Sequence, residues 1–324
     1  MRVGDIWRNL ASNDLAVLAI WATALVLLHT LTNGQYGFHR DELATLDDAR
    51  SLAWGYVAYP PVTPLLARFA FTLFGASLGG LRFFAALALG LVLILTGMMA
   101  RHLGGGRQAQ VLAALAASIS GVAFSAGMLF QYVSFDYLWW VAAAYFIVRL
   151  LASDDPRWFL ALGTAIGLGM LTKYTMMFLA VGIAAGVLLT PARRYLRSPW
   201  LWCGVALASV IFLPNFQWQI RHHFVSLDAL QSIHARDIRM GRTDGFVLDQ
   251  FWIATNPATV PLWLAGLYYL FATKDGKCYR PIGWMFIVTF LLFVLGRGRS
   301  YYMARVIPCC SLQERYGANG GLLR

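Results

Sequence analysis

The feature that most constrains this chain is a series of apolar runs, each close to the length of one bilayer crossing. About 20 apolar residues in a helix span the hydrocarbon core, where only helices and closed barrels satisfy the backbone polar groups. The pattern therefore predicts an all-α polytopic membrane protein with about nine transmembrane helices. The runs lie at residues 15–32, 80–100, 109–130, 135–152, 158–172, 175–190, 199–214, 249–272 and 281–296.

Composition supports this class and excludes others. Of the 324 residues, 59% are hydrophobic and 13% are charged, and the mean hydropathy of +0.60 is too high for a soluble globular domain. The formal net charge of +11 comes from short basic runs between the apolar segments, so we expect no nucleic-acid partner. The four cysteines show neither metal-site spacing nor a disulfide framework.

A further apolar segment, residues 62–78, is interrupted by Arg68 and Gly75. We interpret it as an interfacial helix rather than a crossing. If the N-terminus is cytoplasmic, every short basic loop then lies on the cytoplasmic side, as the positive-inside rule requires. One extra crossing at residues 62–78 would invert the sidedness of everything after it.

This topology gathers the unusual polar residues at the extracytoplasmic ends of the helices, where we expect a site. A transporter would instead be expected to hold ionisable groups near the bilayer midplane, on broken helices related by an internal repeat. Neither feature is visible, but transport of an anionic lipid or a lipid-linked sugar is kept as the alternative function. Five segments carry the polar residues, namely 33–79, 131–136, 172–174, 214–249 and 297–302.

An acidic cluster in the first of these segments is the first candidate for chemistry. The chain has only 15 acidic residues, and four of them, Asp41, Glu42, Asp47 and Asp48, fall within eight positions beside an apolar span. Carboxylates at a helix N-terminus are stabilised by the helix dipole, so Asp41 should stay ionised and able to accept a proton. The alternative is ordinary capping of a helix by two adjacent acids.

Two later residues are also candidates. Asp136 opens an aromatic-rich span, where it serves either in the site or as a helix N-cap. Lys173 lies between two spans on the side where lysine is disfavoured, which indicates an anionic partner such as a phosphate, although snorkelling to lipid headgroups is the alternative. The arginines of residues 215–249 have a density suited to a phosphate-bearing ligand.

Five motifs resemble those of bacterial glycosyltransferase family 39, the membrane-embedded fold C transferases related to protein mannosyltransferases and the lipid A aminoarabinose transferase. The resemblance covers roughly residues 10 to 304. The motifs are Phe38-His39-Arg40-Asp41-Glu42-Leu43; Leu52-Ala53-Trp54-Gly55-Tyr56-Val57 leading to Pro60-Pro61-Val62-Thr63-Pro64-Leu65; Gly167-Leu168-Gly169-Met170-Leu171-Thr172-Lys173-Tyr174; Pro214-Asn215-Phe216-Gln217-Trp218-Gln219; and Gly298-Arg299-Ser300-Tyr301-Tyr302.

The resemblance implies an inverting transferase that uses a polyprenyl-phosphate sugar donor and a lipid, glycan or protein acceptor. It also implies a multi-pass protein of the bacterial inner membrane with its site facing the periplasm. Asp41 matches the general base, Glu42 its neighbour and Asp136 a second acid. For the donor phosphate we expect Lys173, Arg221, Arg236, Arg239, Arg242 and Arg299, and for substrate contacts Tyr59, Tyr301, Tyr302 and His223.

Metal use and the end of the chain carry separate expectations. No cofactor is certain, and a divalent metal ion stays open, although the adjacent His222 and His223 would point roughly 100° apart on a helix. The family pattern ends after Ala304. We therefore expect a membrane-embedded transferase domain at residues 1–304 that is shortened relative to the family, followed by an atypical tail at residues 305–324.

Overall fold

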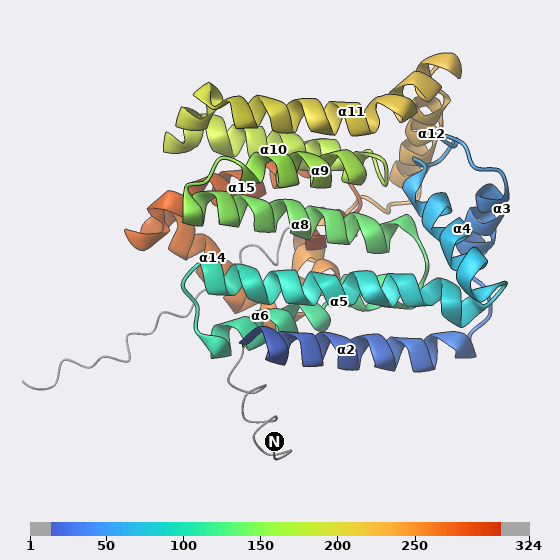
Figure 1. The fold of residues 1–324 in the computed structure, drawn as a ribbon, viewed down its shortest axis with the longest axis horizontal. Coiled ribbons are helices and arrows are strands. Elements are labelled where there is room, and N and C mark those ends of the chain that lie inside the picture. Colours follow the sequence, from blue (N-terminus) through green and yellow to red (C-terminus); the bar gives the residue numbers. More distant parts are fainter. Residues whose placement is uncertain (1–13, 306–324) are drawn as a thin grey trace, which may run out of the picture.

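The computed structural model describes residues 14–305, so nearly all of the expected tail lies outside the described residues. Within this range every regular element is a helix. The long helices lie side by side with their axes nearly parallel (Figure 1). They are α2 (Asp14–Thr32), α5 (Leu78–His102), α8 (Tyr132–Ser153), α11 (Pro199–Arg221) and α15 (Arg280–Leu295).

The expected nine crossings are not confirmed. Five described segments are long and apolar enough to span a membrane, or up to seven if each of two bent helix pairs counts as one span. The bent pairs are α6 (Arg107–Ser118) with α7 (Gly121–Met128), at 67°, and α10 (Met176–Leu188) with η2 (Pro191–Arg197), at 103°. Three apolar helical segments are shorter, namely α4 (Val62–Phe74), α9 (Trp158–Met170) and Pro257–Ala272, which contains η4 (Pro257–Thr259) and α14 (Val260–Ala272).

Local capping explains two of the differences from the hydropathy pattern. The expected span 109–130 breaks because α6 ends at Ser118 and the Ser120 hydroxyl accepts a hydrogen bond from the Ala123 N–H, which starts α7. The expected span 249–272 is interrupted by a π-helical turn, η3 (Gln250–Ala254), which follows the short helix α13 (Phe246–Asp249). Neither break changes the hydrophobicity of the segment, so hydropathy does not reveal it.

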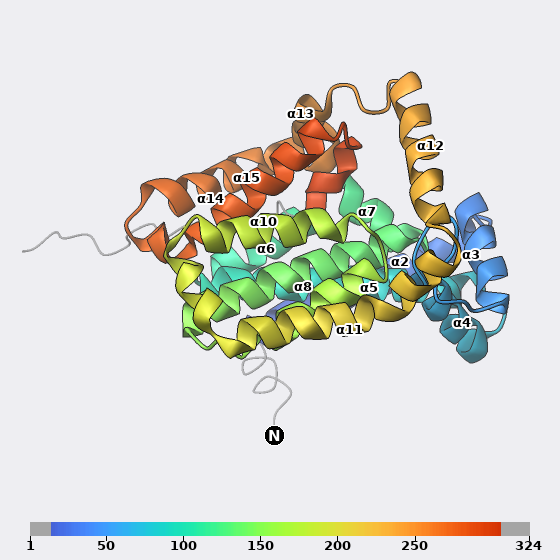
Figure 2. The same ribbon diagram turned by 90° about the horizontal axis from the view of Figure 1, so that it is seen from above.

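Three helices lie across one end of the bundle. They are α3 (Arg40–Arg50), α4 and α12 (Val225–Arg239), and α12 stands crosswise to the long helices (Figure 2). The 3₁₀ turns η1 (Asn33–Gln35) and η6 (Ser300–Arg305) connect to the same end, whereas η5 (Asp275–Tyr279) lies between α14 and α15. This end therefore contains the first polar segment of the sequence.

Close packing joins the helices behind this end. Trp140 on α8 is buried and stacks on Phe293 of α15, with ring centroids 6.2 Å apart. Helices α9 and α11 approach through Gly163 and Gly204, where a side chain on Gly163 would place its Cβ 2.1 Å from the Gly204 carbonyl oxygen. Such small-residue contacts are typical of helix association in membranes. They fix the positions from which the polar side chains project.

Candidate active site

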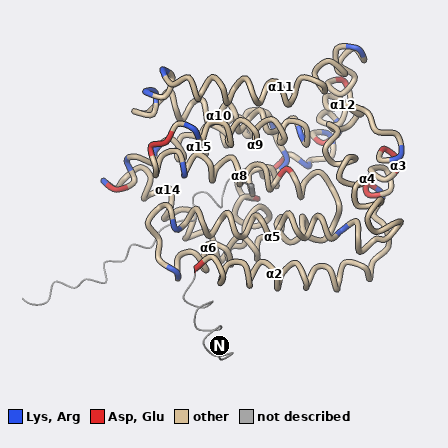
Figure 3. The backbone as a smooth tube through the Cα atoms, in the orientation of Figure 1, with Lys and Arg blue, Asp and Glu red and all other residues tan. Residues whose placement is uncertain are grey.

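Charged residues collect at the two ends of the bundle, with a further group near the ends of α8 and α9 (Figure 3). At the end carrying α3 and α12, side-chain contacts join all five polar segments predicted from the sequence. They include Asp41 with Gln131, Lys173 with Tyr132 and Tyr302, and Asp237 with Arg299. The structure therefore builds one polar region from segments far apart in the chain.

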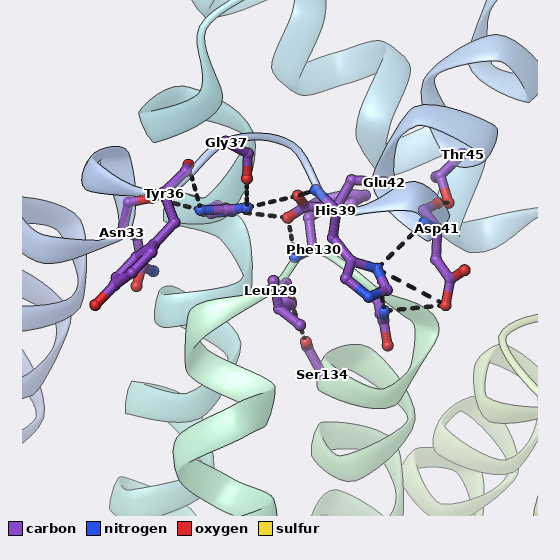
Figure 4. A network of polar contacts seen from close by, with 12 residues as sticks. Asn33, Tyr36, Gly37, His39, Asp41, Glu42, Thr45, Leu129, Phe130 and Ser134 are labelled. Atoms are coloured by element: carbon purple, nitrogen blue, oxygen red, sulfur yellow. Dashed lines mark hydrogen bonds and ion pairs between the residues drawn. The ribbon is translucent and has the colours of Figure 1, made fainter.

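Glu42 lies at the centre of a buried network (Figure 4). It is fully buried and receives two hydrogen bonds from Arg82 of α5, from Nε to Oε1 at 2.8 Å and from Nη2 to Oε2 at 2.7 Å. The backbone N–H groups of His39 and Phe130 also donate to it, at 2.8 and 2.9 Å. Arg82 in turn donates to three backbone carbonyls of the first loop, those of Asn33, Tyr36 and Gly37.

This network gives Glu42 contacts typical of a structural residue, although the sequence placed it with the catalytic acids. Burial by itself would raise the pKa of Glu42, but the hydrogen bonds from Arg82 and from the two backbone N–H groups outweigh it and lower the pKa. A carboxylate with these partners and no solvent exposure has no room to take a proton from a substrate. Its contacts join the first loop, α5 and the turn between α7 and α8.

Asp41, one residue earlier, faces outward. Its side chain is 46% exposed, and Gln131 Nε2 donates to Oδ2 at 3.2 Å while Arg40 Nε donates to Oδ1 at 3.2 Å. His39 precedes the helix, and its Nδ1 accepts from the Asp41 N–H at 3.2 Å. Asp41 is thus held against the α7–α8 turn while part of its carboxylate remains open to a substrate.

Asp136 is not a helix cap. Helix α8 begins at Tyr132, so Asp136 lies one turn inside it, and its side chain is fully buried. Trp140 Nε1, one turn further along, donates to Asp136 Oδ1 at 3.0 Å. The carboxylate is therefore part of the buried interior of the bundle just below the polar region.

Lys173 projects into a group of tyrosines. Its Nζ lies 4.2 Å from the ring centroid of Tyr302, 4.7 Å from that of Tyr132 and 5.5 Å from that of Tyr301. Cation–π contacts of this kind contribute about 0.5–2 kcal/mol each. The ammonium is buried among these rings, which does not fit the alternative of a lysine that snorkels to lipid headgroups.

The predicted arginines divide into two groups. Arg299 donates to Asp237 Oδ2, at 2.7 Å from Nε and 2.5 Å from Nη2, while Arg242 lies 3.4 Å and Arg236 4.0 Å from Oδ1. Asp237 is nearly buried, and three guanidinium groups around one carboxylate leave an excess of positive charge. The remaining arginines, Arg221 and Arg239, are exposed where α11 ends and along α12, as is His223, which was predicted for substrate contacts.

Tyr59 is held by Asp48, an aspartate of the acidic cluster to which the sequence assigned no separate role. The Tyr59 hydroxyl donates to Asp48 Oδ2, and the Tyr59 ring lies 6.1 Å from that of Tyr132. Burial and the neighbouring Asp47 raise the pKa of Asp48, and the hydrogen bond from Tyr59 opposes that shift only in part. Burial and Asp48 likewise raise the pKa of the Tyr59 hydroxyl, which stays protonated.

The motif at the end of α11 positions the first loop. Asn215 Nδ2 donates to the Trp54 carbonyl at 2.7 Å, and Gln219 Nε2 donates to the Ser226 hydroxyl at 2.7 Å. The Ser226 hydroxyl donates to the Tyr56 carbonyl at 2.8 Å. These polar side chains of α11 and α12 therefore hold the backbone that leads to Tyr59.

Sequence reasoning missed Arg82, Tyr132 and Gln131, and it gave Asp48 no role beyond its place in the acidic cluster. Arg82 had a usable signal, because an arginine near the start of an apolar span is costly unless it is paired. Asp48 lies seven residues after Asp41, so both occupy one face of α3, a relationship that helical periodicity could have shown. Tyr132 and Gln131 carry no such signal, since tyrosine and glutamine are common near membrane interfaces.

An apolar groove of about 480 Å³ runs between α9, α10 and α11. Its lining extends from Phe159, near the basic end of α9, to Met170 and Phe212, near the polar end.

Within residues 14–305, no cluster of three His, Cys, Asp or Glu side chains is arranged to hold a metal ion.

Comparisons with known proteins agree on a class. Residues 58–218 match the family described as dolichyl-phosphate-mannose-protein mannosyltransferase. The chain is 28% identical over 139 residues to the lipid A galacturonosyltransferase RgtD of Rhizobium johnstonii, an alignment that covers 42% of this chain and 29% of the relative.

Solved structures share the fold at low identity. ArnT from Cupriavidus metallidurans bound to undecaprenyl phosphate superposes with a TM-score of 0.66 at 17% identity, over 90% of this chain and 57% of ArnT. The oligosaccharyltransferase of Archaeoglobus fulgidus, in complex with zinc and sulfate, gives 0.64 at 16% identity, over 93% of this chain and 48% of the other.

The helical fold is that of membrane-embedded transferases of the fold C class. The family match over residues 58–218 and the galacturonosyltransferase relative support the resemblance of this chain to glycosyltransferase family 39. The chain spans 29% of the curated relative and 57% of the ArnT chain.

Proposed function

We propose that this protein transfers a sugar from a polyprenyl-phosphate donor to a hydroxyl group of an extracytoplasmic lipid, glycan or protein. The observation that carries the proposal is the arrangement at one end of the bundle. A half-exposed carboxylate, Asp41, lies at the same end as the tyrosine-enclosed cation of Lys173 and the arginine cluster around Asp237. A base and a set of cations are what transfer from a phosphate-linked sugar requires.

In this mechanism Asp41 acts as the general base. The acceptor oxygen attacks the anomeric carbon, its proton passes to the Asp41 carboxylate, and the bond from the anomeric carbon to the phosphate oxygen breaks. Attack on the face opposite the leaving group inverts the anomeric configuration. Asp41 fits this role better than Glu42, because its carboxylate is partly exposed whereas that of Glu42 is enclosed by Arg82 and backbone N–H groups.

The leaving group is a polyprenyl phosphate, whose negative charge needs nearby cations. Lys173 and the arginines around Asp237, namely Arg236, Arg242 and Arg299, are the candidates that the geometry supports. Arg221 and Arg239 are exposed and lie outside this arginine cluster. No step of this mechanism needs a metal ion, which assays with excess EDTA can check.

The apolar groove along α9, α10 and α11 supports a lipid-linked donor. It lies among the apolar helices, and its lining reaches Met170, three residues before Lys173. A polyprenyl chain in this groove would place its phosphate near the polar end of the bundle. We propose that this end faces the periplasm of a bacterial inner membrane, because the opposite end carries the short basic loops.

The test compares two aspartates of the same helix. Asp41→Asn removes the base and keeps the side-chain shape, so sugar transfer from a purified polyprenyl-phosphate donor should fall by about 10²-fold or more. Asp47→Asn is the matched control, because the Asp47 side chain is 82% exposed and its ion pair, 3.9 Å from Arg50 Nη1, lies on the surface of the same helix. Near wild-type transfer by Asp41→Asn would remove Asp41 from the mechanism.

A further inference from the structure

We propose that Asp48 binds the transferred sugar, by accepting hydrogen bonds from hydroxyl groups remote from the anomeric carbon. This inference rests on the proposed function and adds a specificity residue to its site. Asp48 belongs to neither the base nor the phosphate-binding group, and its half-buried carboxylate accepts a hydrogen bond from Tyr59.

Helix geometry relates Asp48 to Asp41. Seven residues correspond to two helical turns less about 20°, so the two carboxylates occupy one face of α3, about 10 Å apart along the axis. Thr45, between them on this face, is buried. The separation leaves room for one donor sugar ring, with its anomeric carbon beside the acceptor hydroxyl at Asp41 and a remote hydroxyl group at Asp48.

The surroundings of Asp48 also suit a sugar. Tyr59 donates to its Oδ2 atom, and the Tyr59 ring lies 5.9 Å from Tyr56 and 6.1 Å from Tyr132. Tyr132 in turn lies under Lys173. A row of tyrosines therefore leads from Asp48 to the cation assigned to the donor phosphate, and aromatic faces with a polar tip combine apolar contact with hydrogen bonding.

The direction of this row distinguishes donor from acceptor. Lys173 is assigned to the phosphate to which the sugar is attached. Contacts through Tyr132 and Tyr59 connect Asp48 to this lysine, so Asp48 lies on the donor side of Asp41. Asp48 should therefore discriminate among donor sugars and leave the choice of acceptor unaffected. A carboxylate here favours neutral sugars with free hydroxyl groups over a uronic acid, whose own carboxylate it would repel.

The experiment uses purified full-length protein and donors of defined structure. Polyprenyl-phosphate mannose and polyprenyl-phosphate galacturonic acid are compared first, followed by monodeoxy analogues of the better donor. In the wild type, the analogue lacking the hydroxyl that Asp48 contacts should lose about 10- to 100-fold in kcat/KM. In Asp48→Ala, kcat/KM for the parent donor should fall by a similar factor. Within this variant, kcat/KM for the analogue should be no more than about threefold below that for the parent.

Two variants test whether Asp48 only supports Tyr59. Tyr59→Phe removes the hydroxyl that donates to Asp48 but leaves the carboxylate. It should therefore keep the deoxy penalty of the wild type, which is the loss in kcat/KM of the deoxy analogue relative to the parent donor. Asp47→Asn, adjacent but exposed, should behave as the wild type with every donor. If every deoxy penalty is the same in Asp48→Ala, in Asp48→Asn and in the wild type, Asp48 does not contact the sugar.

The wild-type measurement separates this inference from the proposed function. Absence of transfer from either polyprenyl-phosphate donor by folded wild-type protein counts against the proposed function itself. Active wild-type protein with unchanged discrimination in the Asp48 variants overturns only the assignment of Asp48. Thermal unfolding of each variant in detergent identifies a variant that has failed to fold, and Asp48→Asn, which keeps the side-chain shape, then replaces Asp48→Ala.

Discussion

Glu42 and Arg82 form a fully buried ion pair between residues 40 positions apart, with Arg82 Nη2 2.7 Å from Glu42 Oε2. Both side chains have further partners, so neither charge is left without hydrogen bonds. The pair connects α5 to the first turn of α3, where Asp41 lies. The position of the proposed base therefore depends on a contact that does not itself take part in proton transfer.

Breaking this pair should destabilise the protein strongly. Glu42→Gln leaves the Arg82 charge buried without its carboxylate, which typically costs about 3–5 kcal/mol in the free energy of unfolding. Unfolding in detergent, followed by circular dichroism, measures the loss. The double variant Glu42→Leu with Arg82→Met removes both charges and should recover much of the stability. A single Glu42→Gln variant as stable as the wild type would contradict the structural role.

The same pair predicts how stability depends on pH. Arg82 and the backbone N–H groups hold the pKa of Glu42 below its ordinary value of 4.5. The folded protein therefore binds fewer protons at Glu42 than the unfolded chain does, and the stabilisation is fully present above about pH 4.5 and lost as the pH falls through the folded pKa. The melting temperature should decline on acidification, and the decline should be smaller in the Glu42→Leu, Arg82→Met variant. Equal acid sensitivity of both proteins would argue against Glu42 as the responsible group.

The sequence predicted the helical class and the end of the bundle that carries the polar residues, but not their individual roles. Asp41 and Glu42 are adjacent acids of the same helix, and only their partners separate an exposed carboxylate from a buried one. Those partners, Gln131 and Arg82, come from other helices. No local pattern encodes such tertiary contacts.

The count of nine spans was not confirmed for a related reason. Hydropathy measures only how apolar a segment is, whereas the break at Ser120 depends on a side-chain cap and the break at η3 on a π-helical turn of the backbone. For Lys173, by contrast, the sequence did give a signal. Its unusual place between two spans was visible in the sequence, but the tyrosines that enclose it come from α8 and η6.

Sidedness can be tested with single cysteines. In a background with Cys203, Cys309 and Cys310 changed to serine, Asp47→Cys on α3 should react in right-side-out spheroplasts with a membrane-impermeant maleimide. The native Cys278, exposed at the opposite end beside the basic residues of η5, should react only after permeabilisation. Labelling of both positions from outside, or of Cys278 alone, would contradict the proposed periplasmic orientation.

The last prediction concerns the charge of Lys173. Its Nζ lies among Tyr132, Tyr301 and Tyr302 at the polar end of the bundle, so we expect it to contribute to binding of the donor phosphate. Lys173→Met keeps the apolar stem and removes the ammonium, which should weaken binding by about 1.5–3 kcal/mol if a charge-assisted hydrogen bond is lost. That loss corresponds to a roughly 10- to 150-fold higher Kd.

Polyprenyl phosphate without a sugar is the suitable ligand, because its binding reports the phosphate contact alone, and the measurement is made in nanodiscs. Lys277→Met, at the opposite end of the bundle, is the matched control and should bind as the wild type does. Lys173→Arg should retain part of the affinity, since it keeps the charge but changes its geometry. Unchanged affinity in a folded Lys173→Met protein would restrict Lys173 to packing against the tyrosines and leave the phosphate to the arginines around Asp237.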